Sequence, residues 1–332
     1  MIVEISVNNY RQQRCITANA LVTDYIRRKV MSAYNLTNET QLRNFTQIDV
    51  KIDPEYGIAW VYQDPSPRHC FNPTMVEELR SLQIMLEVNG GTLPYRGDNV
   101  KIDYLVLDSR TPGVFSMGGD LGLFRHCVVN QDKDKLLKYA KSCIDTIHGF
   151  IVGCRLPITT IALVRGDALG GGFEVALSCQ VMIAEEQAEL GFPEILFNIF
   201  PGMGGYHLLS QRLPHKQVEK MMLDGRKYPS SELYDMGVID ELVAKDKGKE
   251  AVYAFVKNSN KYRNGHVAMK TVREKVHPIS HDELIEVTKY WVDVTMNISD
   301  RDLKLMDRLV KAQTKKAAGD MPEVQYRQES IA

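Results

Sequence analysis

The sequence has 332 residues, of which 44% are hydrophobic and 25% charged, a composition typical of a globular protein with a substantial core. The formal net charge of −1 lacks the basic excess that a nucleic-acid surface needs, so no nucleic-acid partner is expected. No apolar run approaches the roughly 20 residues that cross a bilayer, so no membrane span is expected.

Strands and helices are expected to alternate through most of the chain. Residues 1–45 are polar and predict an N-terminal extension with one short helix at Leu21–Val30. After it, two short runs flank Asp53-Pro54, a turn signal that indicates a β-hairpin. The expected strands are 47–52, 57–63, 102–107, 158–164, 181–184 and 188–192, and the expected helices of this part are 73–88 and 132–152.

After Pro201 the pattern becomes mainly helical. One strand is expected at 238–243, and the polar tail from Lys315 is expected to fray. Early alternation followed by late helices predicts an α/β core with a helical C-terminal extension. The expected helices of this part are 207–212, 216–223, 230–236, 248–262, 267–275, 281–297 and 301–313.

Two glycine-rich segments, Leu105–Phe124 and Ile161–Gln180, each follow an expected strand. Backbone N–H groups at the start of a helix are unpaired and can bind an anion, and glycine lets a ligand approach the backbone. For either segment alone, an ordinary tight turn is an equally good explanation. Neither contains GxxxxGK[ST], GxGxxG with an acidic partner, or GxSxG, so phosphate-loop, dinucleotide and serine-hydrolase sites are not expected.

Glu174 and Glu194 are the candidate catalytic residues. Glu174 follows Gly170-Gly171-Gly172, where its simplest role is to complement a helix dipole. Glu194 lies in GFPEILFNIFPG, where a buried carboxylate needs a partner, although the residue could also face solvent in a loop. Placed together beside backbone donors, two carboxylates would form an apparatus for general acid–base catalysis.

The segment ALGGGFEVALSCQVMIAEEQAELGFPEILFNIFPGMGG resembles the signature of the enoyl-CoA hydratase/isomerase, or crotonase, superfamily. In that family two glutamates stand 20 positions apart, as here (194 − 174 = 20), and VFSMGGDL resembles its first oxyanion motif. The resemblance spans about 48–243. It implies a crotonase-type spiral core of ββα units at 46–245, followed by a helical region at 246–332 that covers the acyl pocket and mediates oligomerisation.

A finer resemblance is to the diffusible-signal-factor synthases, which make quorum-sensing signals. It rests on PSPRHCFNPTMVEEL, SRTPGVFSMGGDLGLF, GDALGGGFE, PEILFNIFPGMG and RDLKLMDRLVKAQ. Typical CoA hydratases prefer Gly-Ala-Asp to Gly-Gly-Asp and have a different turn after the hairpin. The resemblance implies a dehydratase and thioesterase that converts 3-hydroxyacyl-ACP, where ACP is acyl carrier protein, to a free cis-2-unsaturated fatty acid.

The resemblance also assigns site residues. The amides of Gly119 and Gly171 would form the oxyanion hole, and Glu174 and Glu194 would act as acid and base with separated pKa values. We expect Glu194 to be the more buried carboxylate with the higher pKa, because its neighbours are apolar. The expected substrate-binding residues, several of which could equally be ordinary core, are Met117, Gly118, Leu121, Phe124, Gly172, Leu190, Phe197 and Gly202.

Further expectations concern cofactors, partners and location. The substrate thioester is carried on ACP or CoA, no other cofactor is implied, and the lack of HExxH predicts no metal. The family resemblance implies a homotrimer or a dimer of trimers. The six cysteines form no CxxC pair and no secretion-signal pattern is present, which predicts reduced thiols and a cytoplasmic location. The alternatives are an enoyl-CoA hydratase/isomerase acting on acyl-CoA and a non-catalytic binding module.

Overall fold

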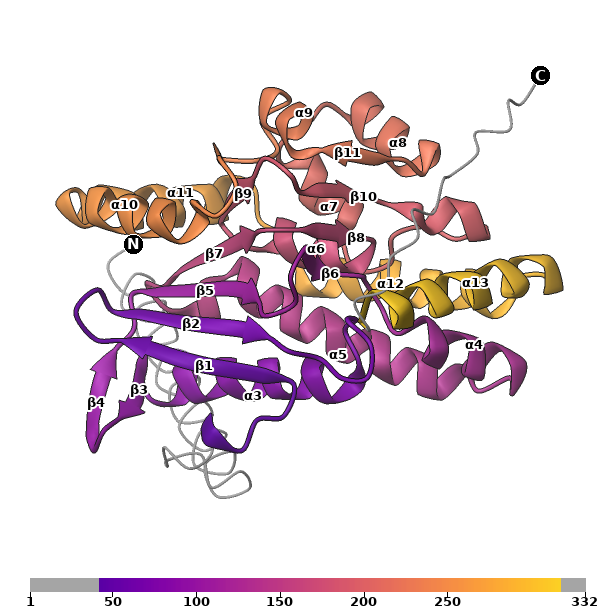
Figure 1. The fold of residues 1–332 in the computed structure, drawn as a ribbon, viewed down its shortest axis with the longest axis horizontal. Coiled ribbons are helices and arrows are strands. Elements are labelled where there is room, and N and C mark those ends of the chain that lie inside the picture. Colours follow the sequence, from indigo (N-terminus) through magenta and orange to yellow (C-terminus); the bar gives the residue numbers. More distant parts are fainter. Residues whose placement is uncertain (1–41, 318–332) are drawn as a thin grey trace, which may run out of the picture.

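The computed structural model describes residues 42–317, and a six-stranded sheet organises them (Figure 1). The first two strands form the expected hairpin, with Ile52 opposite Ala59. The remaining neighbours in the sheet are parallel. In spatial order the strands are β1 (Ile48–Asp53), β2 (Ile58–Gln63), β5 (Tyr104–Ser109), β7 (Thr159–Val164), β9 (Val181–Glu185) and β12 (Glu241–Val243).

A second, four-stranded sheet consists of short strands that follow those of the first sheet along the chain. Thus β5 leads to β6, β7 to β8 and β9 to β10, and each pair is followed by a helix. This repeated ββα order confirms the expected α/β class and brings three strand-to-helix junctions to one region. The strands in spatial order are β11 (Lys227–Pro229), β10 (Glu189–Gly191), β8 (Asp167–Leu169) and β6 (Val114–Ser116).

Helices cover the sheets, and side-chain capping fixes the starts of several of them. The side chain of Asn72 accepts a hydrogen bond from Met75 N at the start of helix Pro73–Val88. The side chain of Asp132 likewise accepts one from Lys135 N at the start of helix Lys133–Ile151. The core helices are α3 (Pro73–Val88), α4 (Leu121–Val129), α5 (Lys133–Ile151), η1 (Gly153–Arg155), α6 (Gly171–Ser178), η2 (Pro193–Phe197), α7 (Gly205–Ser210), α8 (His215–Asp224) and α9 (Ser230–Asp235).

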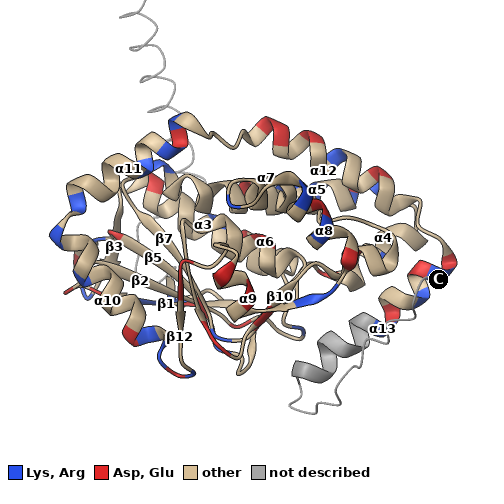
Figure 2. Ribbon diagram, turned by 90° about the horizontal axis from the view of Figure 1, so that it is seen from above, with Lys and Arg blue, Asp and Glu red and all other residues tan. Residues whose placement is uncertain are grey.

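Four helices complete the described chain and lie along the outside of the core (Figure 2). The third of them packs on α5, and the fourth packs on α4 and η2. The first two lie at the opposite end of the molecule from the fourth (Figures 1 and 2). They are α10 (Gly248–Lys261), α11 (Arg263–Val276), α12 (His281–Met296) and α13 (Asp300–Ala317).

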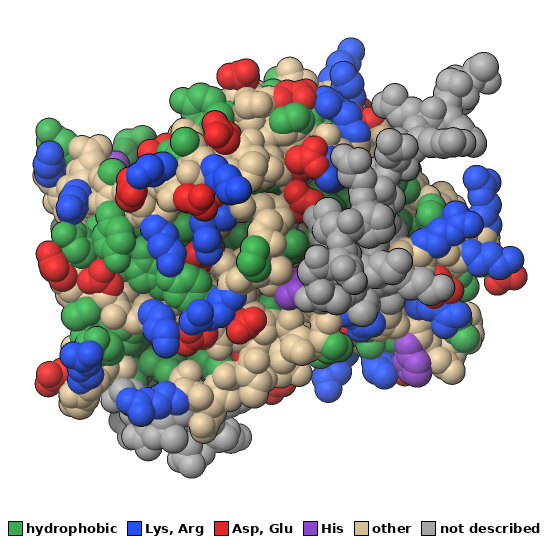
Figure 3. Space-filling view, viewed as in Figure 1, with side chains coloured by type: hydrophobic (Ala, Val, Ile, Leu, Met, Phe, Trp, Pro, Cys, Tyr) green, Lys and Arg blue, Asp and Glu red, His purple; other side chains and the backbone are tan. Residues whose placement is uncertain are grey.

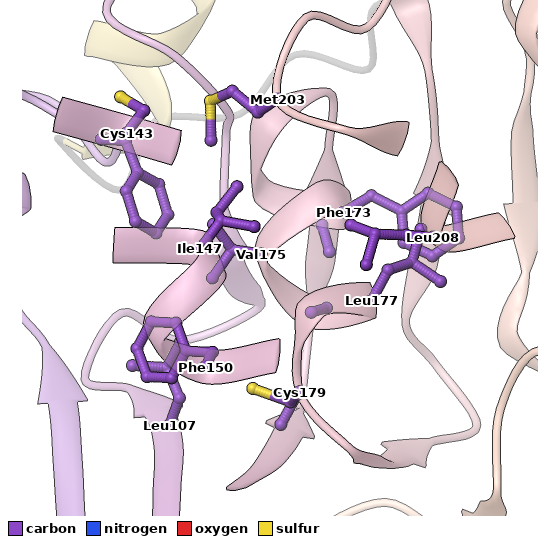
Figure 4. Packing of buried hydrophobic residues seen from close by; sticks show 14 of the residues in the cluster. Leu107, Cys143, Ile147, Phe150, Phe173, Val175, Leu177, Cys179, Met203 and Leu208 are labelled. Atoms are coloured by element: carbon purple, nitrogen blue, oxygen red, sulfur yellow. The ribbon is translucent and has the colours of Figure 1, made fainter. Parts of the chain in front are cut away.

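The core centres on α6, every residue of which is buried. Val175 faces Ile147 of α5, while Phe173 and Leu177 lie beside Leu208 of α7 (Figure 4). Burying such side chains contributes roughly 1.5–3 kcal/mol each, which fixes α6 rigidly between its neighbours. The described cysteines, which exclude Cys15, are all free and buried, as expected.

Several elements differ from those expected from sequence. The strands β6, β8 and β11 were missed because each has three residues, too few to show a periodic pattern. The hairpin of β3 (Thr92–Tyr95) and β4 (Asp98–Lys101) and helix α4 were also missed. The strand expected at 238–243 forms only at Glu241–Val243, because Val238 N bonds back to Leu233 O at the end of α9.

Other expectations fall at the ends of the chain. The helix expected at Leu21–Val30 lies outside the described residues, and α13 continues through Lys315 to Ala317. Within residues 42–317, no helix has the length and apolar character required to cross a membrane. On the face shown in Figure 3, positive and negative side chains of the described residues are interspersed.

Candidate active site

Helix α6 and the start of α7 together fix the Glu174 carboxylate. Glu174 lies in the first turn of α6, where its amide donates to Gly170 O. Its Oε1 accepts hydrogen bonds from the amides of Met203 and Gly205, both at 2.8 Å. With 1% of its surface exposed, this side chain is held in one orientation by donors from the start of a neighbouring helix.

Glu194 approaches the same region from η2. The side chain is 8% exposed, and its Oε2 has no hydrogen-bond partner among the described residues. Gly170, with φ of 54° and ψ of −127°, lies against it, since a Cβ at this position would be 2.4 Å from Glu194 Oε1. Glycine is therefore required at 170 both for the backbone conformation and for the approach of the carboxylate, and the solvent-facing alternative for Glu194 is wrong.

The two carboxyl groups influence each other. Burial raises the pKa of Glu174 to about 7, although its two backbone N–H donors oppose the rise. Burial raises the pKa of Glu194 well above its ordinary value, and the nearby charge of Glu174 raises it further. Glu194 does therefore hold its proton more strongly, but the expectation that it is the more buried of the two is wrong. The difference arises because the amides of Met203 and Gly205 both donate to Glu174, whereas Oε2 of Glu194 has no partner among the described residues and the Glu174 charge lies near it.

Two glycine amides lie side by side near the carboxylates. Gly119 follows β6 and Gly171 begins α6, and a Cβ on Gly171 would be 3.2 Å from Gly119 N. Gly118 has φ of +89°, and a Cβ there would be 2.8 Å from Leu169 O, so the first junction can pack against the second only through glycine. Adjacent backbone donors of this kind suit a carbonyl oxygen that gains negative charge.

Both carboxylates and both glycines line one cavity of about 80 Å³. Of the residues expected from sequence to bind substrate, six line it, namely Met117, Gly118, Leu121, Phe124, Phe197 and Gly202. Four further residues line the cavity that were not predicted from sequence, namely Tyr139 and Cys143 of α5, Met203, and Trp291 of α12. Trp291 lies more than 100 positions beyond Glu174, and the apolar pattern of its helix gave no sign of which surface it would cover.

Two of the expected substrate-binding residues do not line this cavity. Leu190 is fully buried in β10 and packs in the hydrophobic core, so its assignment is corrected. Gly172 is corrected as well, since a Cβ at this position would be 2.4 Å from Ser116 O. Its lack of a side chain allows α6 to pack closely against β6, which is a structural role and not a ligand contact.

The substitution Gly172→Ala tests that role. We expect it to destabilise the protein by about 1–3 kcal/mol, because the methyl group meets backbone that cannot rotate away. Urea unfolding of the variant measures the loss. Gly265→Ala in α11 is the matched control, since a Cβ there meets nothing within 4 Å, and we expect it to leave stability unchanged or slightly higher. Equal midpoints for both variants would contradict the packing role.

The described residues contain no group of three or more His, Cys, Asp or Glu placed to hold a metal ion. The chemical groups that the cavity offers are two carboxyls of unequal pKa, a pair of backbone amides and an apolar wall. This combination can remove a proton from one carbon and add one to a leaving group while holding an oxyanion.

Known proteins are similar to this chain in sequence and in fold. A model of the enoyl-CoA hydratase/isomerase family matches residues 63–306. An enoyl-CoA isomerase/hydratase of Penicillium crustosum is 34% identical over 218 residues, covering 63% of this chain and 23% of the fungal protein. A probable mitochondrial enoyl-CoA hydratase 2 of Arabidopsis thaliana is 27% identical over 274 residues, covering 79% and 82% of the two chains.

The fold comparison agrees with the sequence comparison. The crystal structure of a putative enoyl-CoA hydratase from Streptomyces avermitilis superimposes with a TM-score of 0.64 at 18% identity, covering 81% of this chain and 91% of that one. The chain spans about a quarter of the length of the first curated relatives that it matches. The family match nevertheless extends over most of the described residues, from β2 into α13. The chain belongs to the enoyl-CoA hydratase/isomerase family.

Proposed function

We propose that this protein dehydrates a 3-hydroxyacyl thioester carried on ACP and then hydrolyses the product to a free cis-2-unsaturated fatty acid. The observation that carries the proposal is the arrangement of Glu174 and Glu194 on one cavity that the adjacent Gly119 and Gly171 also line. The unequal pKa values of the carboxyls support separate roles as base and acid.

In the first reaction, ionised Glu174 takes the proton from the carbon next to the thioester carbonyl. Negative charge develops on the carbonyl oxygen, where the amides of Gly119 and Gly171 stabilise it. Protonated Glu194 gives its proton to the 3-hydroxyl, which leaves as water while the carbon–carbon double bond forms. The reaction leaves Glu174 protonated and Glu194 ionised, so both atoms and charge balance.

In the second reaction, ionised Glu194 removes a proton from a water molecule that attacks the thioester carbonyl. The same two amides stabilise the oxygen of the tetrahedral intermediate. The carbon–sulfur bond then breaks, the thiol of the carrier leaves with the proton of Glu174, and the free acid remains. Glu194 keeps the proton taken from water, so both carboxyls return to their starting states.

The preference for the signal-synthase reaction rests on sequence features of this branch, including Gly118-Gly119-Asp120. The structure offers a physical reason for glycine at the second position. A Cβ on Gly119 would be 2.5 Å from Phe124 Cζ, so the ring occupies the space that an alanine methyl would need. A hydratase with Gly-Ala-Asp requires a different packing of this wall.

The second candidate is an enoyl-CoA hydratase/isomerase acting on acyl-CoA. It is favoured by the names of the relatives, which include an enoyl-CoA isomerase/hydratase and a probable enoyl-CoA hydratase. The same glutamates and amides could add water reversibly to a 2-enoyl thioester, with the carbon–sulfur bond left intact.

Product analysis by mass spectrometry distinguishes the candidates. Purified protein is incubated with a 3-hydroxyacyl-ACP and with the matching 3-hydroxyacyl-CoA. Release of a free cis-2-unsaturated acid, faster from ACP, supports the proposed synthase. Reversible interconversion of intact CoA thioesters would replace it with the hydratase/isomerase. Absence of turnover with either carrier would indicate a binding module.

We also propose that the chain forms a homotrimer or a dimer of trimers. Helix α11 has no buried residue, yet it exposes Met269, Val272 and Val276, which lie on one face at helical spacing. An apolar stripe of this kind is typical of a surface that another protein chain covers. The described residues thus provide a candidate contact face on the helix-rich part of the chain.

The substitution Met269→Asp tests this face. We expect it to lower the mass of the assembly in light scattering after size exclusion, because a charge would be desolvated in the contact. Thr271→Asp, at an exposed position on the opposite side of the same helix, serves as the control and should leave the mass unchanged. A wild-type monomer, or an unchanged mass for Met269→Asp, would count against the proposed contact.

A further inference from the structure

The backbone around Gly119 is held by a second segment of chain, residues 68–71. The amide of Met117 donates to His69 O at 2.9 Å, and the amide of Phe71 donates to Gly118 O at 2.8 Å. Phe71 and Gly119 also form a parallel β-bridge. The position of Gly119 therefore depends on where Phe71 lies.

The hydroxyl of Tyr139, on α5, joins these two segments. It donates a hydrogen bond to Phe71 O and accepts one from Asp120 N at 3.3 Å. Asp120 is the residue directly after Gly119, so one oxygen atom contacts both the segment that flanks Gly119 and the peptide unit that follows it. The side chain is 7% exposed and lies in the middle of α5, a rigid element of the core.

Arg68 and Phe124 hold the same loop from other directions. The guanidinium of Arg68 donates to Asp120 Oδ1 at 2.7 Å, and that oxygen also accepts from Leu123 N at 3.1 Å. The Phe124 ring lies against Gly119 and packs edge-on against the Tyr139 ring at 5.7 Å. These contacts leave the loop few ways to move without breaking the Tyr139 bonds.

We propose that Tyr139 is a positioning residue whose hydroxyl sets the direction of the Gly119 amide in the oxyanion hole. The inference rests on the proposed function, because it assumes that the Gly119 amide binds a thioester oxygen. A donor of this kind acts at about 2.7–3.1 Å, and a displacement of about 1 Å can cost on the order of a hundredfold in rate.

A direct role for Tyr139 as the acid is less consistent with its contacts. Its hydroxyl already donates to Phe71 O and accepts from Asp120 N. Burial raises the pKa of Tyr139 well above 10, so the hydroxyl keeps its proton through the neutral range. Tyr139 thus acts through the backbone that it holds.

The test compares Tyr139→Phe with Tyr104→Phe in the full chain. Both variants remove one hydroxyl from a buried tyrosine. Tyr104 lies in a separate core cluster, and its hydroxyl donates a hydrogen bond to Asn260 Oδ1. We expect Tyr139→Phe to lower kcat for the 3-hydroxyacyl thioester about tenfold with little change in KM. Tyr104→Phe should leave both constants near the wild-type values.

A spectroscopic probe measures the oxyanion hole without turnover. Cinnamoyl-CoA absorbs at longer wavelength when donors polarise its carbonyl, so bound probe reports on the Gly119 amide. We expect a smaller shift with Tyr139→Phe than with the wild type or Tyr104→Phe. If Tyr139→Phe does not fold, Arg68→Gln serves instead, because it removes the bond from the partly exposed guanidinium to Asp120 Oδ1 and so loosens the same loop. This variant should also give a smaller shift than the wild type.

The outcomes separate the two proposals. If the wild type shifts the probe and turns over the thioester, and Tyr139→Phe does both equally well, the positioning role is wrong while the proposed function stands. Where Tyr139→Phe does not fold, the same result for Arg68→Gln has the same meaning. If the wild type neither shifts the probe nor turns over a thioester, the proposed function fails and the inference falls with it. A reduced shift together with a reduced kcat supports both.

Discussion

Replacement of Glu194 by glutamine is expected to lower kcat for dehydration by about a thousandfold, while the protein remains folded. Glutamine keeps the shape of the side chain but cannot give a proton to the departing hydroxyl. General acid–base groups typically contribute factors of about 10²–10⁴. The rate factor contributed by Glu194 is expected near the upper part of that range, because without a proton donor the hydroxyl would have to leave as hydroxide into an apolar cavity.

Steady-state kinetics with a 3-hydroxyacyl thioester check this expectation. Glu186→Gln is the matched control, because Glu186 is an exposed glutamate eight positions earlier that does not line the cavity (194 − 186 = 8). We expect the control to keep the wild-type kcat and both variants to give the wild-type circular dichroism spectrum. A Glu194→Gln variant that retains half of the wild-type kcat would remove Glu194 from the mechanism.

The sequence could point to the proposed catalytic pair because both glutamates lie in short segments with strong local signals. Gly170-Gly171-Gly172 before Glu174 marks a helix start, and two prolines bracket the apolar stretch around Glu194. Local pattern could not show that Oε1 of Glu174 binds the amides of Met203 and Gly205. The order of the two pKa values depends on those donors, which explains why burial was the wrong reason for it.

The residues that the sequence placed wrongly are those whose surroundings are set by distant elements. Leu190 was expected among the substrate-binding residues, but the pleat of β10 directs its side chain into the core. Gly172 belongs to the same glycine cluster as Gly171, yet the next step along α6 faces Ser116 of β6. Successive residues of a helix face different directions, so Gly171 can line the cavity while Gly172 packs against a neighbouring strand.

Two residues of the cavity wall could not be predicted from their own helices either. Trp291 reaches it because α12 packs on α5, and Tyr139 reaches it because α5 packs beside the loop that follows β6. Neither residue has a signal in its own helix beyond an apolar face, which is typical of any packed helix. Such residues can be assigned only once the packing of the helices is known.

The last prediction concerns stability, since Glu174 must be desolvated to serve as a base. In the unfolded chain its pKa is that of an ordinary glutamate, 4.5, whereas in the folded protein it is about 7. Between these values the folded protein keeps a proton that the unfolded chain releases. Stability therefore falls as pH rises from about 4.5 to 7, and the difference of 2.5 pKa units corresponds to about 3 kcal/mol.

Glu174→Gln removes this titration while keeping an oxygen that can accept from Met203 N and Gly205 N. The free energy of unfolding of the variant, minus that of the wild type, is expected to rise by up to about 3 kcal/mol between pH 4.5 and pH 8. Urea unfolding at a series of pH values measures this difference. Glu194 adds its own fall in stability with pH in both proteins. The Glu174 charge raises the pKa of Glu194 only in the wild type, so this fall is no larger in the variant and the sign of the expected difference is kept.

The control for this series is again Glu186→Gln, whose exposed side chain is replaced without altering the buried pair. We expect its difference from the wild type to stay constant over the same pH range. A constant difference for Glu174→Gln as well would mean that the carboxyl titrates as it does in the unfolded chain. In that case Glu174 would be ionised without a desolvation cost, and the basis for unequal roles of the two carboxyls would be lost. A rise confined to Glu174→Gln would instead show that the fold holds this carboxylate at the expense of stability, as expected for a group kept for proton transfer.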